Sequence, residues 1–341
     1  MTRLTIITDK MEGMSIDHIA NALAAAAMEL GADVKIVRAG KVHGEEVAGA
    51  HVISLLPTEL FRYVAGFRFA RPATFTTVIA SNWEERELPD QLKLLAYHMA
   101  PTWSGVPVQL VAHSKHTTDL VQKLLRSMMS PSFARAVSAQ LETVMYGIES
   151  GFEPGTNDPD SLVVPYNRIN QTQKRCGLQA TITHEYNLMS LSRGRNVTST
   201  FYRGAADYAM SDVPAEMVGV HEFQQEPASR EVFKVNARTH GMFVCTSLFE
   251  SFGIYYLELL ASGVVGVFAD APWHKSLLPG YRYTAKSQHL SAMMMHVREN
   301  YDEARRYLLD EVRPAIIEKY SISRFNAELL AHAQGGVSWV A

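Results

Sequence analysis

The sequence predicts an α/β protein built from two doubly wound domains that face each other across a cleft. Short apolar runs rich in β-branched residues alternate with longer segments of helical periodicity, as in parallel sheets joined by crossover helices. Residues 153–160 (EPGTNDPD) are dense in Pro, Gly, Asn and Asp and separate one such series from the next. With 341 residues, 47% of them hydrophobic, the chain is long enough for two cores.

The first series begins with a strand, a loop, a helix and a second strand. Leu4–Thr8 is the predicted strand, and the helix runs from Ile16 to Leu30, where Gly31 ends it. Val34–Val37 is the next strand. No G-x-G-x-x-G sequence follows the first strand, which argues against a nicotinamide dehydrogenase.

Further strands are predicted in both series. In the first they are His51–Leu56, Phe75–Ala80, Val108–Ala112 and Val144–Ile148, and in the second they are Leu162–Pro165, Ala180–Thr183, Met217–Val220, Met242–Cys245 and Val264–Phe268. The segment from Tyr301 to Gln334 predicts two charged amphipathic helices. We therefore expect domains at residues 1–157 and 158–320, followed by a C-terminal helix in 321–341 that returns to the first domain.

Residues 246–263 (TSLFESFGIYYLELLASG) carry the strongest chemical signal. They place Glu250 in the turn after a buried strand and Glu258 inside the following helix, with its side chain leaning back toward the helix start. The N–H groups of Phe252, Gly253 and Ile254 have no partner within that helix, and together with the helix dipole they favour phosphate. The alternative is that both glutamates are solvated residues of an amphipathic helix.

This segment closely resembles the Glu-x7-Glu signature of the retaining glycosyltransferases with the GT-B fold, family four and its relatives. The resemblance includes Ser247, Phe252, Gly253, Gly263 and the apolar strand that follows. It implies that Glu250 lies beside the donor sugar and that Glu258 binds the ribose hydroxyls. It also implies front-face attack through an oxocarbenium-like transition state, in which the departing phosphate takes the acceptor proton and Glu250 is not a nucleophile.

A second match follows the first strand of the second domain, in residues 165–175 (PYNRINQTQKR). In the same family an arginine and then a lysine hold the donor diphosphate here, so the resemblance assigns Arg168 and Lys174 to the donor. Such cations stabilise the charge that grows on the leaving group. The lysine lies one residue further along than is common, so Arg175 is an alternative, and a solvated basic loop is another. The implied donor-binding residues are Gly13 of the first loop, Arg168, Lys174, Ser251, Phe252, Gly253, Ile254 and Glu258.

The family also has a histidine at the tip of a strand in the first domain, near the sugar. Here His113 follows the strand Val108–Ala112, and it is the catalytic candidate beside Glu250. The alternative is a structural histidine that caps or packs. No metal or other cofactor is expected, because Asp158-Pro159-Asp160 matches the metal motif of GT-A enzymes only in its letters and falls in the linker.

Residues 61–71 (FRYVAGFRFAR) interleave aromatic rings with Arg62, Arg68 and Arg71. Such a segment could follow a nucleic-acid strand, with guanidinium groups on phosphates and rings on bases. The alternative is an amphipathic segment with its rings packed inward.

Several blocks of the chain, including those around Glu12, His113, Asn167 and Glu250, together look like bacteriophage glycosyltransferases, some of which modify hydroxymethylated pyrimidines in phage DNA. The favoured acceptor is therefore such a base, and the favoured donor is UDP-glucose or a close relative. The alternatives are a polysaccharide or glycolipid acceptor, a GT-B-like sugar epimerase, and a silent protein that only binds a nucleotide sugar.

Composition limits partners and location. The net charge of −3 argues against adhesion to nucleic acid or membrane through bulk charge, and no apolar run reaches the ~18 residues of a membrane span. Only Cys176 and Cys245 are present, which favours a reducing compartment. A cytoplasmic location is expected, in the host if a phage encodes the chain, and the sequence does not predict an oligomeric state.

Overall fold

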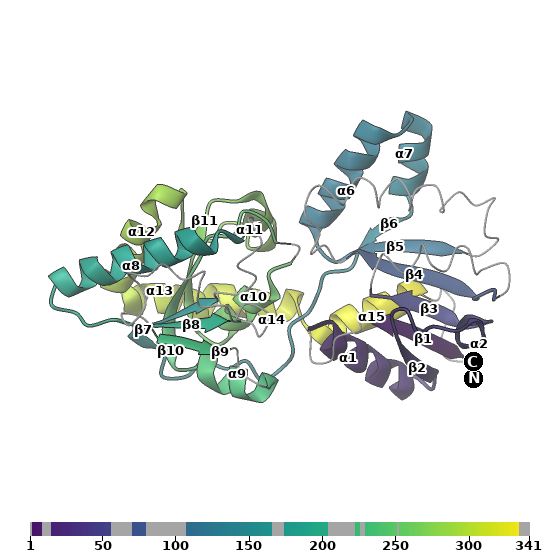
Figure 1. Ribbon diagram of the computed structural model, residues 1–341, viewed down its shortest axis with the longest axis horizontal. Helices are drawn as coiled ribbons and strands as arrows, with labels where there is room; N and C mark the ends of the chain where they lie inside the picture. Colours follow the sequence, from purple (N-terminus) through teal and green to yellow (C-terminus); the bar gives the residue numbers. More distant parts are fainter. Residues whose placement is uncertain are drawn as a thin grey trace. The chain divides into compact units, whose positions relative to one another are not determined.

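The computed structural model describes residues 2–8, 15–55, 70–79, 107–165, 174–203, 222–225, 229–250 and 252–333. The chain divides into two compact units, the first made of residues 1–147 and 320–341 and the second of residues 148–319. The described part of each unit holds a six-stranded parallel sheet (Figure 1). This confirms the predicted α/β class with two parallel sheets. The predicted boundary between residues 157 and 158 falls inside the second unit.

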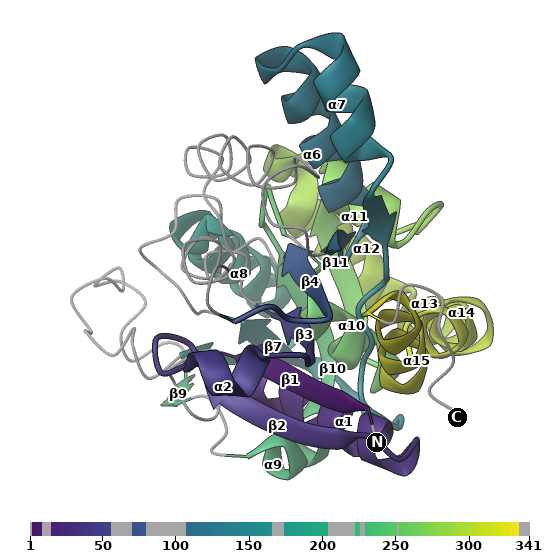
Figure 2. The ribbon, with the colours of Figure 1, turned by 90° about the vertical axis from the view of Figure 1, so that its right-hand side faces the viewer.

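The sheet of the first unit has the order β2-β1-β3-β4-β5-β6. Its strands are β1 (Arg3–Thr8), β2 (Asp33–Arg38), β3 (His51–Ser54), β4 (Thr74–Ile79), β5 (Val108–Ala112) and β6 (Leu141–Thr143). All neighbours pair in parallel, and β1 to β4 can be followed in Figure 2. Because the strands after β1 continue on both of its sides, the strand order reverses between β1 and β3.

The described helices of the first unit are α1 (Ser15–Glu29), α2 (Gly44–Val47), α6 (Lys115–Met128), α7 (Pro131–Ser138) and α15 (Ile322–Ala333). As predicted, α1 stops just before Gly31, which has a φ of 81°. Helix α15 packs against α1 and contacts β3, β4 and β5. The Thr74 hydroxyl donates to the carbonyl of Ala333 (2.7 Å), so the C-terminal helix belongs to the first unit.

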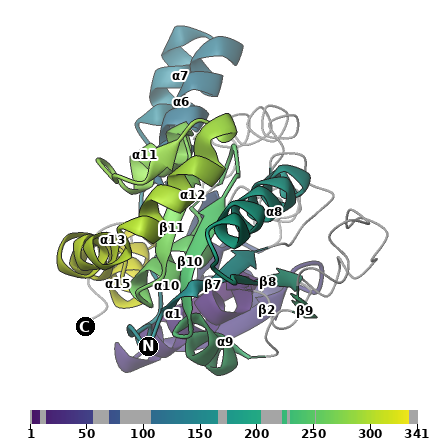
Figure 3. The same cartoon turned by 90° about the vertical axis from the view of Figure 1, so that its left-hand side faces the viewer.

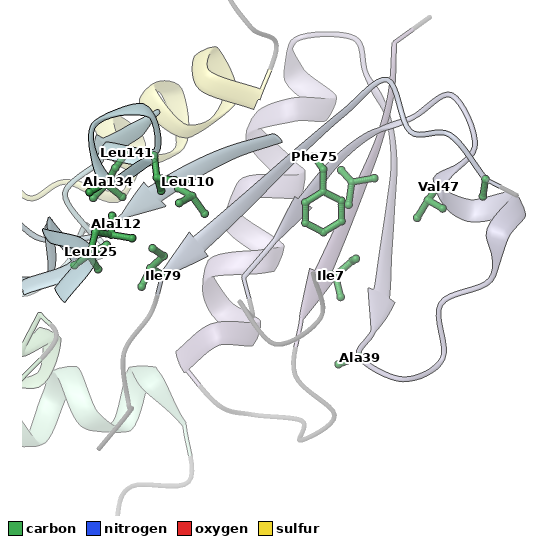
Figure 4. Packing of buried hydrophobic residues seen from close by; sticks show 14 residues of the cluster. Ile7, Ala39, Val47, Phe75, Ile79, Leu110, Ala112, Leu125, Ala134 and Leu141 are labelled. Carbon is green, nitrogen blue, oxygen red and sulfur yellow. The ribbon is translucent and has the colours of Figure 1, made fainter. Parts of the chain in front are cut away.

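Buried apolar side chains cover one face of this sheet. They include Ile7 of β1, Phe75 and Ile79 of β4 and Leu110 of β5, each without exposed surface. Figure 4 shows the cluster running from Val47 across the sheet to helices α6 and α7. Burying each large side chain contributes about 1.5–3 kcal/mol, which explains why these short strands read as continuous apolar runs.

The sheet of the second unit has the order β12-β11-β10-β7-β8-β9. Its strands are β7 (Asp158–Pro165), β8 (Thr198–Arg203), β9 (Glu222–Gln225), β10 (His240–Cys245), β11 (Val265–Ala269) and β12 (Thr284–Ala285). The chain moves outward from β7 in one direction and from β10 in the other. The strand order therefore reverses between the neighbours β7 and β10.

The described helices of the second unit are α8 (Cys176–Ser192), α9 (Arg230–Ala237), α10 (Ile254–Ala261), α11 (Pro272–Leu277), α12 (Leu290–Glu299), α13 (Tyr301–Tyr307) and α14 (Arg313–Lys319). Helices α8 and α12 lie side by side (Figure 3), while α10 packs on β11 and α14. A π-helical turn, Leu308–Val312, joins α13 to α14. Because parallel crossovers are right-handed, helices joining strands on opposite sides of the reversal cover opposite faces of the sheet.

Two predicted strands are wrong. Ala180–Thr183 lies inside α8, where the Thr183 hydroxyl donates to the carbonyl of Gln179 (2.8 Å). The short β-branched run imitates a strand, but the longer helical context decides its conformation. Val144–Ile148 follows β6 without forming a strand, although the N–H of Val144 still donates to Ala112 (3.0 Å). The predicted strand Met217–Val220 lies outside the described residues.

The predicted linker is also too long at its C-terminal end. Asp158, Pro159 and Asp160 open strand β7, and both carboxylate oxygens of Asp160 accept hydrogen bonds from Arg298 (each 2.7 Å). Arg298 lowers the pKa of Asp160 through this hydrogen bond. The Asp-x-Asp letters therefore belong to a strand and a structural ion pair.

Candidate functional site

The residues just after β10 meet the residues just before α8, the helix that follows β7, at the carboxyl edge of the second sheet. Strands β7 and β10 are hydrogen-bonded neighbours, with Phe243 beside Val163. The hydroxyl of Thr246, just past the end of β10, donates to the carbonyl of Lys174, just before α8 (3.1 Å). In open α/β sheets, ligands bind outside the carboxyl ends of the strands where the strand order reverses. The second unit has its reversal at this edge.

At this edge the structure brings together two residues predicted from the sequence. The ammonium group of Lys174 donates a hydrogen bond to Oε1 of Glu250. The pair is largely shielded, since the two side chains are 15% and 11% exposed. An ammonium group has three donors and a carboxylate about four acceptor positions, so both groups can bind a ligand without leaving each other.

The turn between Glu250 and α10 requires glycine at residue 253. Gly253 has a φ of 72°, in the left-handed region, and a Cβ there would lie 2.8 Å from the ring of Trp273. The indole N–H of Trp273 donates to the carbonyl of Ser247 (3.0 Å), and the side chain is buried. Trp273 therefore supports both ends of the turn that carries Glu250. Nothing in the sequence marks this role.

Two helices begin at the same edge, α8 after β7 and α10 after β10. The positive ends of the two helix dipoles favour an anion at this edge. Arg175, the residue before α8, has a φ of 54°, which is uncommon outside glycine. Its guanidinium donates to the hydroxyl of Ser287 (2.9 Å). Of the two neighbouring cations, Lys174 is therefore the one that pairs with Glu250.

Glu258 lies deeper in the unit than Glu250. Its side chain is 1% exposed, and both of its oxygens accept hydrogen bonds from Arg230, the first residue of α9, one of them at 3.0 Å. Burial raises the pKa of the Glu258 carboxyl, and the Arg230 guanidinium opposes that shift. Arg230 could not be predicted from the sequence, because it is 28 residues from Glu258 and belongs to no motif.

His113, at the carboxyl end of β5, is buried in the first unit. Its ring packs edge-on against Tyr146, with ring centroids 4.7 Å apart, and it hydrogen-bonds the backbone of Ile79. Burial lowers the pKa of His113 to about 4, so the imidazole is neutral at pH 7. These are the contacts of a packed structural histidine, and its catalytic role stays a prediction.

Of the other predicted site residues, the structure describes only some. Phe252 is buried and Ile254 begins α10, while Arg71 is exposed in the first unit. Gly13, Arg62, Arg68, Arg168 and Ser251 lie outside the described residues. Within the described ranges, no three His, Cys, Asp or Glu side chains are grouped to hold a metal ion. Over the same ranges, no helix has the length and apolarity to span a membrane.

The whole chain is similar in fold to solved glycosyltransferases. HepE of Anabaena in complex with UDP-glucose has 10% identity and a TM-score of 0.71, and the alignment covers 98% of this chain and 100% of HepE. The fold is that of the GT-B glycosyltransferases. WaaG, a glycosyltransferase involved in lipopolysaccharide biosynthesis, has 12% identity and a TM-score of 0.62, with 98% of this chain and 100% of WaaG covered.

A third solved structure is similar over a smaller part of its length. The pneumococcal O-GlcNAc transferase GtfA, in complex with UDP and GlcNAc, has 13% identity and a TM-score of 0.55, covering 84% of this chain and 56% of GtfA. In sequence, no family model and no curated protein matches the chain. The GT-B fold predicted from the Glu-x7-Glu segment is thus confirmed, and the resemblance to phage enzymes stays a prediction.

Proposed function

We propose that this protein is a glycosyltransferase that takes its sugar from a nucleotide-diphosphate sugar. The observation that supports it most strongly is the Lys174–Glu250 pair at the strand-order reversal of the second sheet, beside the starts of two helices. A cation and two helix dipoles suit a diphosphate, and a carboxylate suits sugar hydroxyls. HepE with UDP-glucose and GtfA with UDP and GlcNAc share the fold, which favours a UDP-sugar, UDP-glucose first.

Each residue has a distinct part in this proposal. Lys174 keeps one donor on Glu250 and turns the others to the diphosphate, with Arg168 as a second cation. The N–H groups at the start of α10, from Phe252 to Ile254, face the same negative charge. Glu250 lies beside the sugar, and Glu258 accepts hydrogen bonds from the ribose hydroxyls.

The transfer proceeds with retention of configuration. The bond between the anomeric carbon and the diphosphate oxygen breaks, and the acceptor oxygen forms its bond on the same face of the sugar. The acceptor proton passes to the departing phosphate oxygen. Lys174, Arg168 and the helix starts stabilise the leaving group without a metal ion, and the charge of Glu250 stabilises the cationic sugar.

Two classes of acceptor each have support. The alternation of aromatic residues with arginines in residues 61–71 favours a hydroxymethylated pyrimidine in DNA, and the described member of that group, Arg71, is exposed. The fold shared with WaaG, an enzyme of lipopolysaccharide biosynthesis, favours a polysaccharide or glycolipid. A sugar epimerase and a silent nucleotide-sugar-binding protein are the alternatives that need no acceptor.

Donor binding is tested first, by calorimetry with UDP-glucose, UDP-GlcNAc, ADP-glucose and GDP-mannose, and by native mass spectrometry of the purified protein. At least one donor should bind, and Lys174→Met should weaken it about tenfold or more, as expected for a charged hydrogen bond. Lys275→Met is the matched control, because Lys275 pairs with Asp270 (2.5 Å) but both side chains are largely exposed. If no nucleotide sugar binds, the proposed function is wrong.

Transfer is tested with the bound donor in labelled form. The acceptor panel holds hydroxymethylated DNA, unmodified DNA, oligosaccharides and lipopolysaccharide-type glycolipids. Label on hydroxymethylated DNA alone supports a nucleic-acid acceptor. Label on a glycan or glycolipid alone refutes the nucleic-acid acceptor. An altered sugar without transfer identifies an epimerase, and binding without turnover identifies a silent protein. NMR of the product should show the donor's anomeric configuration.

A further inference from the structure

We propose that Arg230 is a positioning residue for nucleotide recognition. It holds the carboxylate of Glu258 ionised and oriented, and thereby makes the protein prefer ribonucleotides over 2′-deoxyribonucleotides. This inference rests on the proposed function, in which Glu258 meets the ribose.

The contact between the two side chains is a two-point fork. Two terminal nitrogens of Arg230 donate separately to the two oxygens of Glu258. Such a planar fork sets the rotation of the carboxylate as well as its place. A carboxylate has about four lone-pair positions, and the fork occupies two of them. The remaining two match the neighbouring 2′- and 3′-hydroxyls of ribose, of which 2′-deoxyribose keeps only the 3′-hydroxyl.

Arg230 is itself held by the residues around it. Its guanidinium lies over the rings of Phe152 and Phe233, 5.4 and 5.7 Å from their centroids. Oε2 of Glu149 lies 3.7 Å from its Nε, and the same oxygen lies 3.4 Å from Nζ of Lys234. The side chains that surround Arg230 thus come from three parts of the second unit: the segment before β7, helix α9 and helix α10. Lys234 also pairs with Glu231 (2.8 Å), so Glu258 is the carboxylate that makes the two-point contact with Arg230, while Glu149 lies farther from the guanidinium.

Charge matters as much as orientation at this position. A carboxylate that is 1% exposed takes up a proton unless a cation compensates its charge. A protonated Glu258 would present a donor where the ribose hydroxyls are also donors. Burial pushes the pKa of Glu258 upward, and Arg230 works against that push. Removal of the guanidinium should therefore make nucleotide binding both weaker and dependent on pH.

The test compares matched ligands on matched variants. Calorimetry measures UDP against 2′-deoxy-UDP, and the ADP and GDP pairs if UDP does not bind. The wild type should prefer the ribonucleotide by roughly tenfold or more, the effect of a hydrogen bond to a charged group. Arg230→Gln should reduce that preference to about twofold or less, and its UDP affinity should rise with pH as Glu258 ionises. Arg230→Lys keeps the charge but not the two-point contact, so it should retain more of the affinity for UDP than of the preference for UDP over 2′-deoxy-UDP.

Arg298→Gln is the control variant. Arg298 makes the same two-point contact, with Asp160 toward the amino end of β7, and is similarly shielded at 18% exposure. It should leave the ribose preference unchanged. A wild-type protein that binds UDP and 2′-deoxy-UDP equally, or an Arg230→Gln variant that keeps the full preference, overturns the inference and leaves the proposed function standing. If Arg230→Gln does not fold, Arg230→Lys decides by the same measurement. Failure of every nucleotide to bind the wild type refutes the proposed function instead.

Discussion

The two glutamates of one short segment lie in contrasting surroundings. Glu250 is on a turn, 11% exposed, and pairs with the single ammonium group of Lys174. Glu258 is inside a helix, 1% exposed, and both of its oxygens are held by Arg230. A lysine can redirect its donors to a ligand, whereas the arginine fork holds one orientation. The surroundings of Glu250 thus allow its contacts to change when a ligand binds, whereas the surroundings of Glu258 hold its carboxylate in one orientation.

The largest expected difference between the two regions is in stability. Glu258→Ala leaves the half-buried Arg230, 24% exposed, with only the more distant carboxylate of Glu149 (3.7 Å), which should cost about 2–3 kcal/mol of unfolding free energy. Glu250→Ala should cost about 1 kcal/mol, because the long side chain of Lys174 can reach water. Urea denaturation of both variants measures this difference. Equal losses would mean that the two ion pairs are equally replaceable, and replacing both Arg230 and Glu258 by apolar residues should restore part of the stability.

Two buried histidines, unlike the buried glutamates, stay neutral instead of pairing with an opposite charge, and this makes the stability of the protein depend on pH. Burial lowers the pKa of His113 in the first unit and of His274 in the second, each to about 4. Between pH 6.5 and 4 the unfolded chain therefore binds more protons than the folded chain, and stability falls as the pH falls. For His113, the lowering of the pKa from 6.5 to about 4 corresponds to a loss of roughly 3 kcal/mol of unfolding free energy across this pH range.

Urea unfolding at pH 7, 6, 5 and 4 checks this expectation. His113→Gln should lose stability at pH 7 and show a smaller decrease toward pH 4 than the wild type. The exposed His289→Gln serves as the control. An unchanged pH dependence in His113→Gln would show that this imidazole is not buried neutral in solution.

Kinetics should separate the two carboxylates by role. Glu250→Gln should lower turnover about 10²-fold, the usual loss of one electrostatic contact to a transition state, and change nucleotide affinity by less than about threefold. Glu258→Gln should weaken donor binding by roughly 1–3 kcal/mol and change turnover little. Steady-state kinetics and calorimetry on the same preparations give both quantities. Parallel losses of turnover and affinity in the two variants would refute the division of labour.

The smallest expected effect concerns the turn that carries Glu250. Gly253→Ala and Gly280→Ala both place a side chain at positive φ, 72° and 77°, costing about 1–2 kcal/mol each. Only the alanine at residue 253 also meets the ring of Trp273, since residue 280 has open space around it. Gly253→Ala should therefore be less stable by about a further 1 kcal/mol. Thermal unfolding of the two variants provides the comparison, and equal values would show that Trp273 moves aside freely.

Local pattern by itself determined much of this protein. The apolar runs at β1, β4, β5, β10 and β11, the helices α1 and α10, and the glycines that end them are predictable because backbone hydrogen bonding imposes a period on neighbouring residues. The same local reasoning placed Glu250 in a turn and Glu258 in the helix after it. It failed at Ala180–Thr183, where a few β-branched residues resembled a strand inside a long helix.

Only the tertiary structure decided which side chains meet. The order of the second sheet puts β7 beside β10, and this adjacency joins Lys174 to Glu250 across 76 residues of sequence. Arg230 and Trp273 became part of the site in the same way, through packing against α10 and its turn. Such pairings depend on strand order and on the direction of each side chain. No short stretch of sequence records them, because the energy that selects them comes from contacts between distant segments.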